Sequence, residues 1–146
     1  MSDAFAASGR RTLSNQEEFA AFAAGFARRL RPGDVVALSG PLGSGKTTFV
    51  RAVVEALHGD DQTSSPTFTF WHRYEGTPPI DHLDLYRVEE PQEIAELGLD
   101  DAFDGRSIVF VEWWNNAPSL VPGRRYEIDI EGAGDSPRTV TVGEPA

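Results

Sequence analysis

The chain has 146 residues and a formal net charge of −10, from 23 acidic and 13 basic side chains, and it contains no cysteine. This length predicts one domain with a real hydrophobic core. The lack of cysteine excludes disulfides, thiolate catalysis and zinc sites built on thiolates. Strong acidity argues against a general nucleic-acid or anionic-membrane surface. No membrane-length apolar run or signal peptide is visible, so we expect a cytoplasmic protein.

Charge is unevenly distributed along the chain. Nine of the acids and a single arginine lie in residues 81–104, which therefore carry −8 of the total charge. Such a run is either a solvated face or an acidic surface for a basic partner. Among the basic residues, 12 are arginines and only Lys46 is a lysine.

The N-terminal part predicts a flexible end followed by a helix. Residues 1–11 are small and polar, and we expect them to be frayed. Ser14 fits an N-cap with Glu17 reaching back as a capping box. A stripe of apolar residues follows at helical spacing: Phe19, Phe22, Ala23, Phe26 and Leu30.

The rest of the chain alternates between strand and helix patterns. Continuous apolar runs at residues 35–38 and 107–111 are typical of buried strands in a parallel sheet. We expect helices over residues 46–57 and 91–97, and further strands over residues 67–74 and 80–85. Residues 126–130 and 138–142 predict a closing hairpin. The fold class is therefore α/β, a P-loop NTPase-like mixed β-sheet sandwiched by helices, with a C-terminal β-hairpin.

A glycine-rich loop separates the first buried strand from the helix after it. It fits the pattern G-x-x-x-x-G-K-[ST], in which backbone N–H groups and a helix N-terminus face the phosphates of a nucleotide. The lysine of this pattern reaches the β- and γ-phosphates and the hydroxyl binds Mg²⁺. The residues are Gly40, Pro41, Leu42, Gly43, Ser44, Gly45, Lys46 and Thr47.

A phosphate loop needs a carboxylate on a neighbouring strand to hold Mg²⁺, and Glu112 ends the second buried strand. Trp113 and Trp114 follow, as rim packing or as a base-stacking platform. His82, Asp84 and Tyr86 share one face of a predicted strand. That face either lines the nucleotide site, with Asp84 orienting water, or is simply solvated.

Four short segments of the sequence together resemble the bacterial TsaE (YjeE) family, a P-loop ATPase family of tRNA threonylcarbamoyladenosine synthesis. The matching pieces are residues 40–48, Ser65-Pro66-Thr67-Phe68, residues 82–87 and Val111-Glu112-Trp113. The resemblance extends over about residues 14–130. It implies a single Mg²⁺-dependent ATPase domain over 1–146, weak alone, acting with the partner proteins TsaB and TsaD. Any contact with tRNA would then be indirect, through those partners.

The resemblance also implies roles for individual residues. Lys46, Asp84, Glu112 and Thr67 would be catalytic, with Thr67 as a switch hydroxyl, and Thr47 and Glu112 would bind the metal. ATP would contact the loop, Trp113 and the start of the first helix, where Gln16 lies. The expected ATP-binding residues are Gln16, Leu42, Gly43, Ser44, Gly45, Lys46, Thr47, Thr48 and Trp113. Arg138 is a further candidate contact with the nucleotide loop.

Three functional hypotheses remain open at the level of sequence. The leading one is ATP hydrolysis that supports a tRNA-modifying complex. The second is a small-molecule kinase, although its arginines are scattered and the chain is short for a core with a lid. The third is a nucleotide-dependent assembly switch that does not require hydrolysis.

Overall fold

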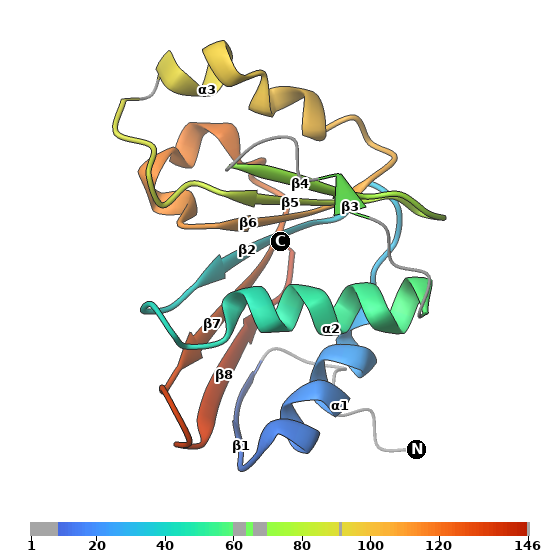
Figure 1. Cartoon of the computed structure of the whole chain (residues 1–146), viewed down its shortest axis with the longest axis vertical. Coiled ribbons are helices and arrows are strands. Elements are labelled where there is room, and N and C mark those ends of the chain that lie inside the picture. The colour runs from blue at the N-terminus through green and yellow to red at the C-terminus, as the bar shows by residue number, and fades with distance from the viewer. Residues whose placement is uncertain (1–8, 60–63, 66–69, 91, 146) are drawn as a thin grey trace.

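The computed structural model describes residues 9–59, 64–65, 70–90 and 92–145. Within these residues, eight strands form one mixed sheet in the order β1-β8-β7-β2-β6-β5-β4-β3 (Figure 1). The strands are β1 Gly9–Leu13, β2 Val35–Ser39, β3 Ser64–Ser65, β4 Trp71–Tyr74, β5 Ile80–Asp84, β6 Ile108–Glu112, β7 Tyr126–Glu131 and β8 Arg138–Gly143. The α-helices are α1 Gln16–Ala27, α2 Lys46–His58 and α3 Gln92–Leu97, and short 3₁₀ turns span Leu99–Ala102, Trp114–Asn116 and Pro118–Leu120.

The centre of the sheet is parallel and its margins are antiparallel. Strand β2 pairs in parallel with β6 and β7, and β5 pairs in parallel with β6. Strands β8, β1, β4 and β3 are added antiparallel on the two sides. The predicted fold class, including the C-terminal hairpin β7–β8, is confirmed.

The apolar residues of the central strands alternate between two cores. Val36 and Leu38 of β2 pack with α1 and α2, whereas Val35 and Ala37 face the opposite core. In Figure 1, α2 lies below β4, β5 and β6, and α3 lies above them. Because both faces of β2 and β6 are covered, these strands are continuously apolar, as the sequence indicated.

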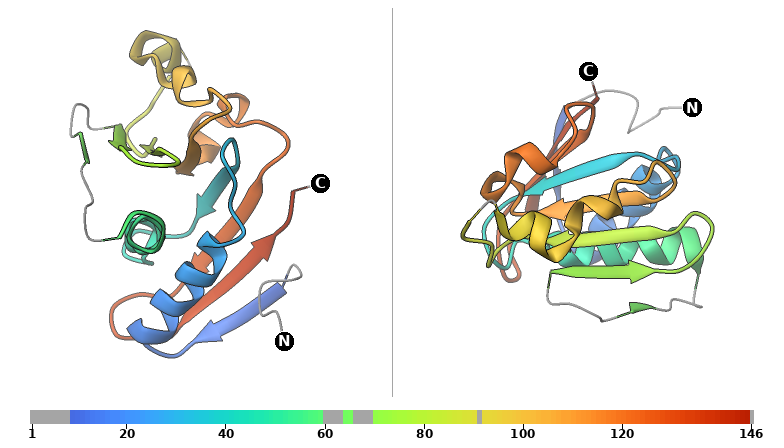
Figure 2. Two further views of the ribbon diagram at one scale, coloured as in Figure 1. Left: turned by 90° about the vertical axis from the view of Figure 1, so that its right-hand side faces the viewer. Right: turned by 90° about the horizontal axis from the view of Figure 1, so that it is seen from above.

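The outer part of the sheet buries only one face. Ile128 and Ile130 of β7 belong to the core beneath α1, whereas Glu127 and Glu131 are exposed and Asp129 is half-buried. Figure 2 shows α1 lying against this part of the sheet. The alternation of apolar and polar residues in β7 follows directly from this one-sided burial.

Two expectations at the N-terminal end are wrong in detail. Gly9–Leu13 form the edge strand β1, paired with β8, although residues up to 11 were expected to be frayed. The helix cap lies one residue later than predicted: Asn15 Oδ1 accepts a hydrogen bond from the Glu18 N–H at 2.9 Å. The Glu18 side chain accepts from the Ser14 N–H at 2.8 Å, so a glutamate still reaches back as expected, but to the residue before the cap.

The remaining element boundaries agree closely with the sequence. Strand β5 ends at Asp84, so Tyr86 lies beyond it and not on the strand. Part of the strand expected over residues 67–74, and the first residue of the helix expected at 91, lie outside the described residues. No helix in the described part of the chain is long and apolar enough to cross a membrane.

Candidate functional site

The loop between β2 and α2 takes a conformation that its glycines permit. Gly40 has φ 145°, and a Cβ at this position would lie 2.3 Å from the carbonyl oxygen of Ile130. Gly45 has φ 109° and directly precedes α2. Any side chain at Gly40 would collide with backbone, so the tight turn onto β7 requires glycine there.

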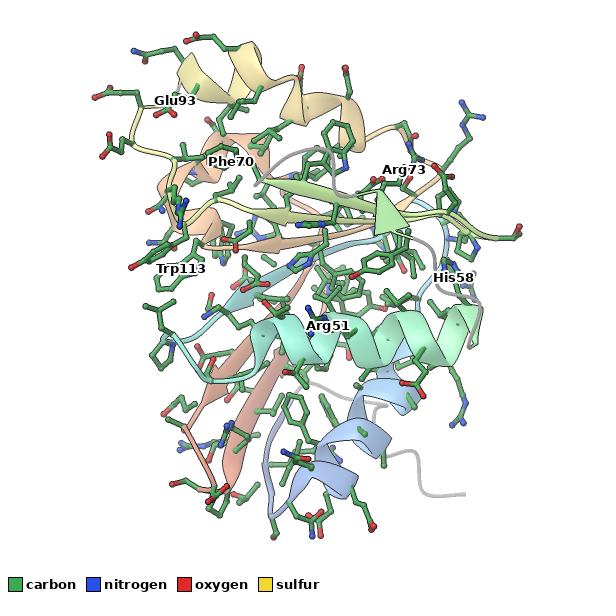
Figure 3. The ribbon with its side chains drawn as sticks, viewed as in Figure 1. Arg51, His58, Phe70, Arg73, Glu93 and Trp113 are labelled. Atoms are coloured by element: carbon green, nitrogen blue, oxygen red, sulfur yellow. The ribbon has the colours of Figure 1, made fainter. Side chains whose placement is uncertain are left out.

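Lys46 is folded back onto this loop. Its Nζ donates to the carbonyl oxygen of Gly40 and, at 3.0 Å, to that of Pro41. The ammonium also lies 4.6 Å from the centre of the Trp113 ring, within cation–π range. Figure 3 shows Trp113 at the end of the sheet where α2 begins. Lys46 is therefore held by backbone dipoles and an aromatic face, and no acid of the described residues forms a direct ion pair with it.

Charged groups surround Lys46 at longer range. Burial lowers the pKa of its ammonium, while the negative charges of Glu112, Asp84 and Asp129 act in the opposite direction. The net pKa lies below the ordinary value of 10.5. A bound anion next to this ammonium would offset part of the free-energy cost of burying its charge.

Glu112 is the centre of a buried hydrogen-bond network. Its Oε2 accepts from the Thr47 hydroxyl at 2.8 Å and from His82 Nε2 at 2.5 Å. Since an ionised carboxylate can only accept, His82 carries its hydrogen on Nε2. Burial alone would raise the pKa of Glu112, but the bonds from His82 and Thr47 and the nearby positive charge hold it below 4.5. Glu112 is thus kept ionised although its side chain is only 5% exposed.

Asp84 lies beside Glu112 at the ends of adjacent parallel strands, as the β5–β6 register requires. Its Oδ1 accepts from the Tyr86 N–H at 3.0 Å, and the Tyr86 ring lies 4.9 Å from that of Trp113. The backbone of Trp113 has φ 58°, a left-handed conformation that is uncommon for a non-glycine residue. This turn brings the indole back toward Lys46 and Tyr86.

Lys46, Asp84, Glu112 and Trp113 line one cavity, which we call the phosphate-loop cavity. Its volume is about 340 Å³. It is lined by Leu42, Gly43, Gly45, Lys46, Thr47, Thr48, Asp84, Tyr86, Glu112, Trp113 and Arg138.

A second cavity of about 270 Å³ adjoins it, and we call this the α1 cavity. The start of α1 and the β7–β8 turn form most of its wall. Its lining residues are Leu13, Ser14, Asn15, Gln16, Phe19, Gly45, Thr48, Gly134, Asp135, Ser136 and Arg138. Gly45, Thr48 and Arg138 line both cavities, so the two are direct neighbours.

The oxygen ligands that Thr47 and Glu112 offer fit a magnesium ion. A hydroxyl and a carboxylate oxygen already lie 2.8 Å apart at the cavity wall, and both are the hard oxygen ligands that Mg²⁺ prefers. Among the residues that the structure describes, no group of three or more His, Cys, Asp or Glu side chains is placed to hold a metal. Mg²⁺ at this site would therefore complete its coordination with water and with phosphates of a bound ligand.

The structure brings nearly all the sequence-predicted site residues together. Lys46, Asp84 and Glu112 line the phosphate-loop cavity with most of the loop, and Gln16 lines the α1 cavity. The Ser44 side chain is fully buried and lines neither cavity. Thr67 lies outside the described residues. The chemical roles assigned to these residues stay predictions.

Sequence reasoning missed the contacts of two residues, His82 and Trp114. His82 was expected to share a polar face with Asp84, and the bond of its ring to Glu112 was not expected. Trp114 points away from the cavity's lining: its Nε1 donates to Ser39 Oγ at 3.0 Å, and the Arg125 guanidinium lies 4.6 Å from its ring. Trp114 is thus packing at the rim, one of the two interpretations left open. None of these contacts has a signal in residue spacing, because the strand order decides them.

The fold and the loop define a P-loop α/β protein, and comparison with known proteins narrows this class. The family model described as threonylcarbamoyl adenosine biosynthesis protein TsaE matches residues 13–140. The chain belongs to the TsaE family. This family takes part in tRNA threonylcarbamoyladenosine biosynthesis.

Individual relatives agree with this membership. The chain is 41% identical over 128 residues to the tRNA threonylcarbamoyladenosine biosynthesis protein TsaE of Bacillus subtilis, covering 87% of this chain and 80% of that protein. It is 37% identical to the TsaE of Rickettsia bellii, covering 89% and 91% respectively. The crystal structure of Bacillus subtilis YdiB matches with a TM-score of 0.78 and 34% identity, covering 96% of this chain and 87% of that one.

Proposed function

We propose that this protein is a Mg²⁺-dependent ATPase that supports threonylcarbamoyl modification of the anticodon-adjacent adenosine of tRNA. One observation carries the proposal: Lys46, the Thr47–Glu112 pair and Asp84 line a single cavity at the start of α2. The loop that binds the phosphates, the metal ligands and a second carboxylate are the groups that phosphoryl transfer to water requires.

Each of these groups has a distinct task in the proposed reaction. Lys46 exchanges the carbonyl oxygens of Gly40 and Pro41 for the β- and γ-phosphates, which offer a stronger, charge-assisted interaction. Thr47 and Glu112 hold Mg²⁺, which neutralises charge on the phosphates when bound. Asp84 orients the attacking water from the end of β5.

The α1 cavity is the proposed site of the adenine and ribose. It adjoins the phosphate-loop cavity at Gly45 and Thr48, which line both, and this places it where the rest of a nucleotide held at the loop would extend. Gln16 and Asn15 supply amide groups, which are suited to hydrogen bonding with a base.

We further propose that the protein acts in the cytoplasm with TsaB and TsaD, and that tRNA contacts those partners. An ATPase with slow turnover on its own can depend on a partner, because an arginine of the partner can supply a further positive charge to the transition state. The net charge of −10 also disfavours direct tRNA binding by this chain.

The test is ATP hydrolysis with and without the TsaB–TsaD pair and tRNA, in Mg²⁺ and in excess chelator. We expect slow turnover alone, stimulation by the pair, and loss of turnover in chelator. Equal support of tRNA modification by ATP and a non-hydrolysable analogue would favour the assembly switch. Faster phosphate transfer to a small metabolite than to water would favour the kinase. Either result would overturn the proposal.

A further inference from the structure

Arg138, the first residue of β8, holds two separate segments of backbone with one guanidinium. Its Nε donates to the Ser44 carbonyl oxygen at 2.7 Å, in the phosphate loop. Its Nη1 and Nη2 donate to the carbonyl oxygens of Ser136 and Gly134 at 2.6 and 3.1 Å, in the β7–β8 turn. No ion pair of Arg138 with an acid is found within the described residues. The cation is therefore engaged by carbonyl dipoles alone.

The contact with Ser44 determines how the next N–H group is aimed. In a planar trans peptide, the C=O and the following N–H point in opposite directions. Since the Ser44 carbonyl points to Arg138, the Gly45 N–H points away from it. Gly45 lines both cavities and directly precedes α2, where free N–H groups attract anions. Arg138 thus fixes the peptide unit that presents a phosphate-binding donor.

The same side chain fixes the outer wall of the α1 cavity. Gly134 and Ser136, whose carbonyl groups it holds, line that cavity. The turn is packed closely onto Arg138, since a Cβ at Gly132 would lie 3.1 Å from Arg138 Cδ. The base of the side chain is anchored by the β1–β8 pairing, which places Arg138 opposite Leu13. Arg138 therefore connects the phosphate loop with the turn that forms the outer wall of the α1 cavity.

We propose that Arg138 is a positioning residue that orients the Ser44–Gly45 peptide for phosphate binding and ties the β7–β8 turn to it. This inference rests on the proposed ATP site. It predicts that Arg138 supports the binding of both the phosphates and the adenosine part of ATP, because its guanidinium is hydrogen-bonded to the phosphate loop and to the β7–β8 turn. A lysine at this position would keep the positive charge, but its ammonium lacks the planar fork that reaches three carbonyl groups at once.

The experiment compares the wild type with Arg138→Ala, Arg138→Lys and Arg51→Ala. Arg51 is exposed on α2 and lines neither cavity, so its removal is a matched loss of one positive charge (Figure 3). Affinities are measured by calorimetry for ATP with Mg²⁺, for pyrophosphate and for adenosine. Thermal midpoints of the ligand-free proteins report whether each variant folds.

We expect Arg138→Ala to weaken ATP binding about 10- to 100-fold, the range for hydrogen bonds that involve a charged group. Pyrophosphate and adenosine should both bind more weakly, Arg138→Lys should remain close to Arg138→Ala, and Arg51→Ala should match the wild type. Full recovery by lysine would assign the effect to charge alone and overturn the positioning role. Lower thermal midpoints with unchanged affinities would mean a merely structural role and also overturn it.

The wild-type titration separates this inference from the proposed function. If the wild type does not bind ATP with Mg²⁺, both are overturned. If the wild type binds ATP and Arg138→Ala binds it equally well, only the role of Arg138 is overturned. Should Arg138→Ala not fold, the decision rests on Arg138→Lys, which preserves the charge and most of the side-chain packing.

Discussion

The two adjoining cavities are built from different kinds of groups. The phosphate-loop cavity gathers the charged side chains of Lys46, Asp84 and Glu112 at the ends of parallel strands and at the start of α2. The α1 cavity is lined mostly by uncharged amides, hydroxyls and glycine backbone. Its walls come from the start of α1 and from the β7–β8 turn, which are distant in sequence.

This difference predicts how strongly ATP binding and turnover depend on a single side chain in each cavity. Removing a buried charged group is costly, because its hydrogen-bond partners are left unsatisfied. Neutral groups that each contribute a modest hydrogen bond can be lost one at a time with graded effects. The predictions below test whether the two cavities differ in this way.

The largest effect is expected for the carboxylates of the phosphate-loop cavity. Glu112→Ala and Asp84→Ala should each lower the turnover of ATP by about 100-fold or more, the range for loss of a group that acts on a transferred proton or its metal. ATP binding should be largely kept, as measured by calorimetry on the same samples. Unchanged turnover in both variants would contradict the roles proposed for these residues.

The next effect concerns affinity. Lys46→Ala should weaken ATP–Mg²⁺ binding by about 100-fold, because a charge-assisted contact with two phosphates is removed. The fold should be retained, since the glycines determine the loop's backbone. Trp113 lies 4.6 Å from the Lys46 ammonium, so its fluorescence in the wild type should change on titration with ATP. Wild-type affinity in the variant would refute the site.

A smaller effect concerns stability and pH. Because the pKa of Glu112 is lowered in the folded protein, its carboxylate contributes stability above the unfolded pKa. That contribution is lost as the pH falls through the folded pKa. The stability advantage of the wild type over Glu112→Gln should therefore shrink from about pH 6 to about pH 3 in urea unfolding without nucleotide. An advantage that grows toward acid would show that the sign is wrong.

The smallest effect is expected in the α1 cavity. Gln16→Ala should weaken ATP binding only about 2- to 10-fold, the range for one neutral hydrogen bond, and leave pyrophosphate binding unchanged. Glu17→Ala, one residue along on α1 and outside both cavities, is the control. A loss as large as that of Lys46→Ala would remove the distinction between the two cavities.

The sequence predicted the phosphate-loop cavity better than the α1 cavity for a physical reason. The loop's pattern is contiguous, and parallel strands bring Asp84 and Glu112 to the same edge of the sheet. The cap of α1 was placed one residue early because Ser14 and Asn15 are both good caps, and local sequence does not choose between them. Strand β1 has no apolar alternation and exists because β8 offers it an edge.

The amino-acid sequence by itself determined the α/β class, the loop around Lys46 and the carboxylates nearest to it, since these depend on local spacing and apolar runs. The tertiary structure alone decided that His82 bonds Glu112, that Trp113 turns back onto Lys46, and that Arg138, a candidate contact with the loop, also holds the β7–β8 turn. Contacts of this second kind depend on strand order and register, which bring together residues that no spacing along the chain connects.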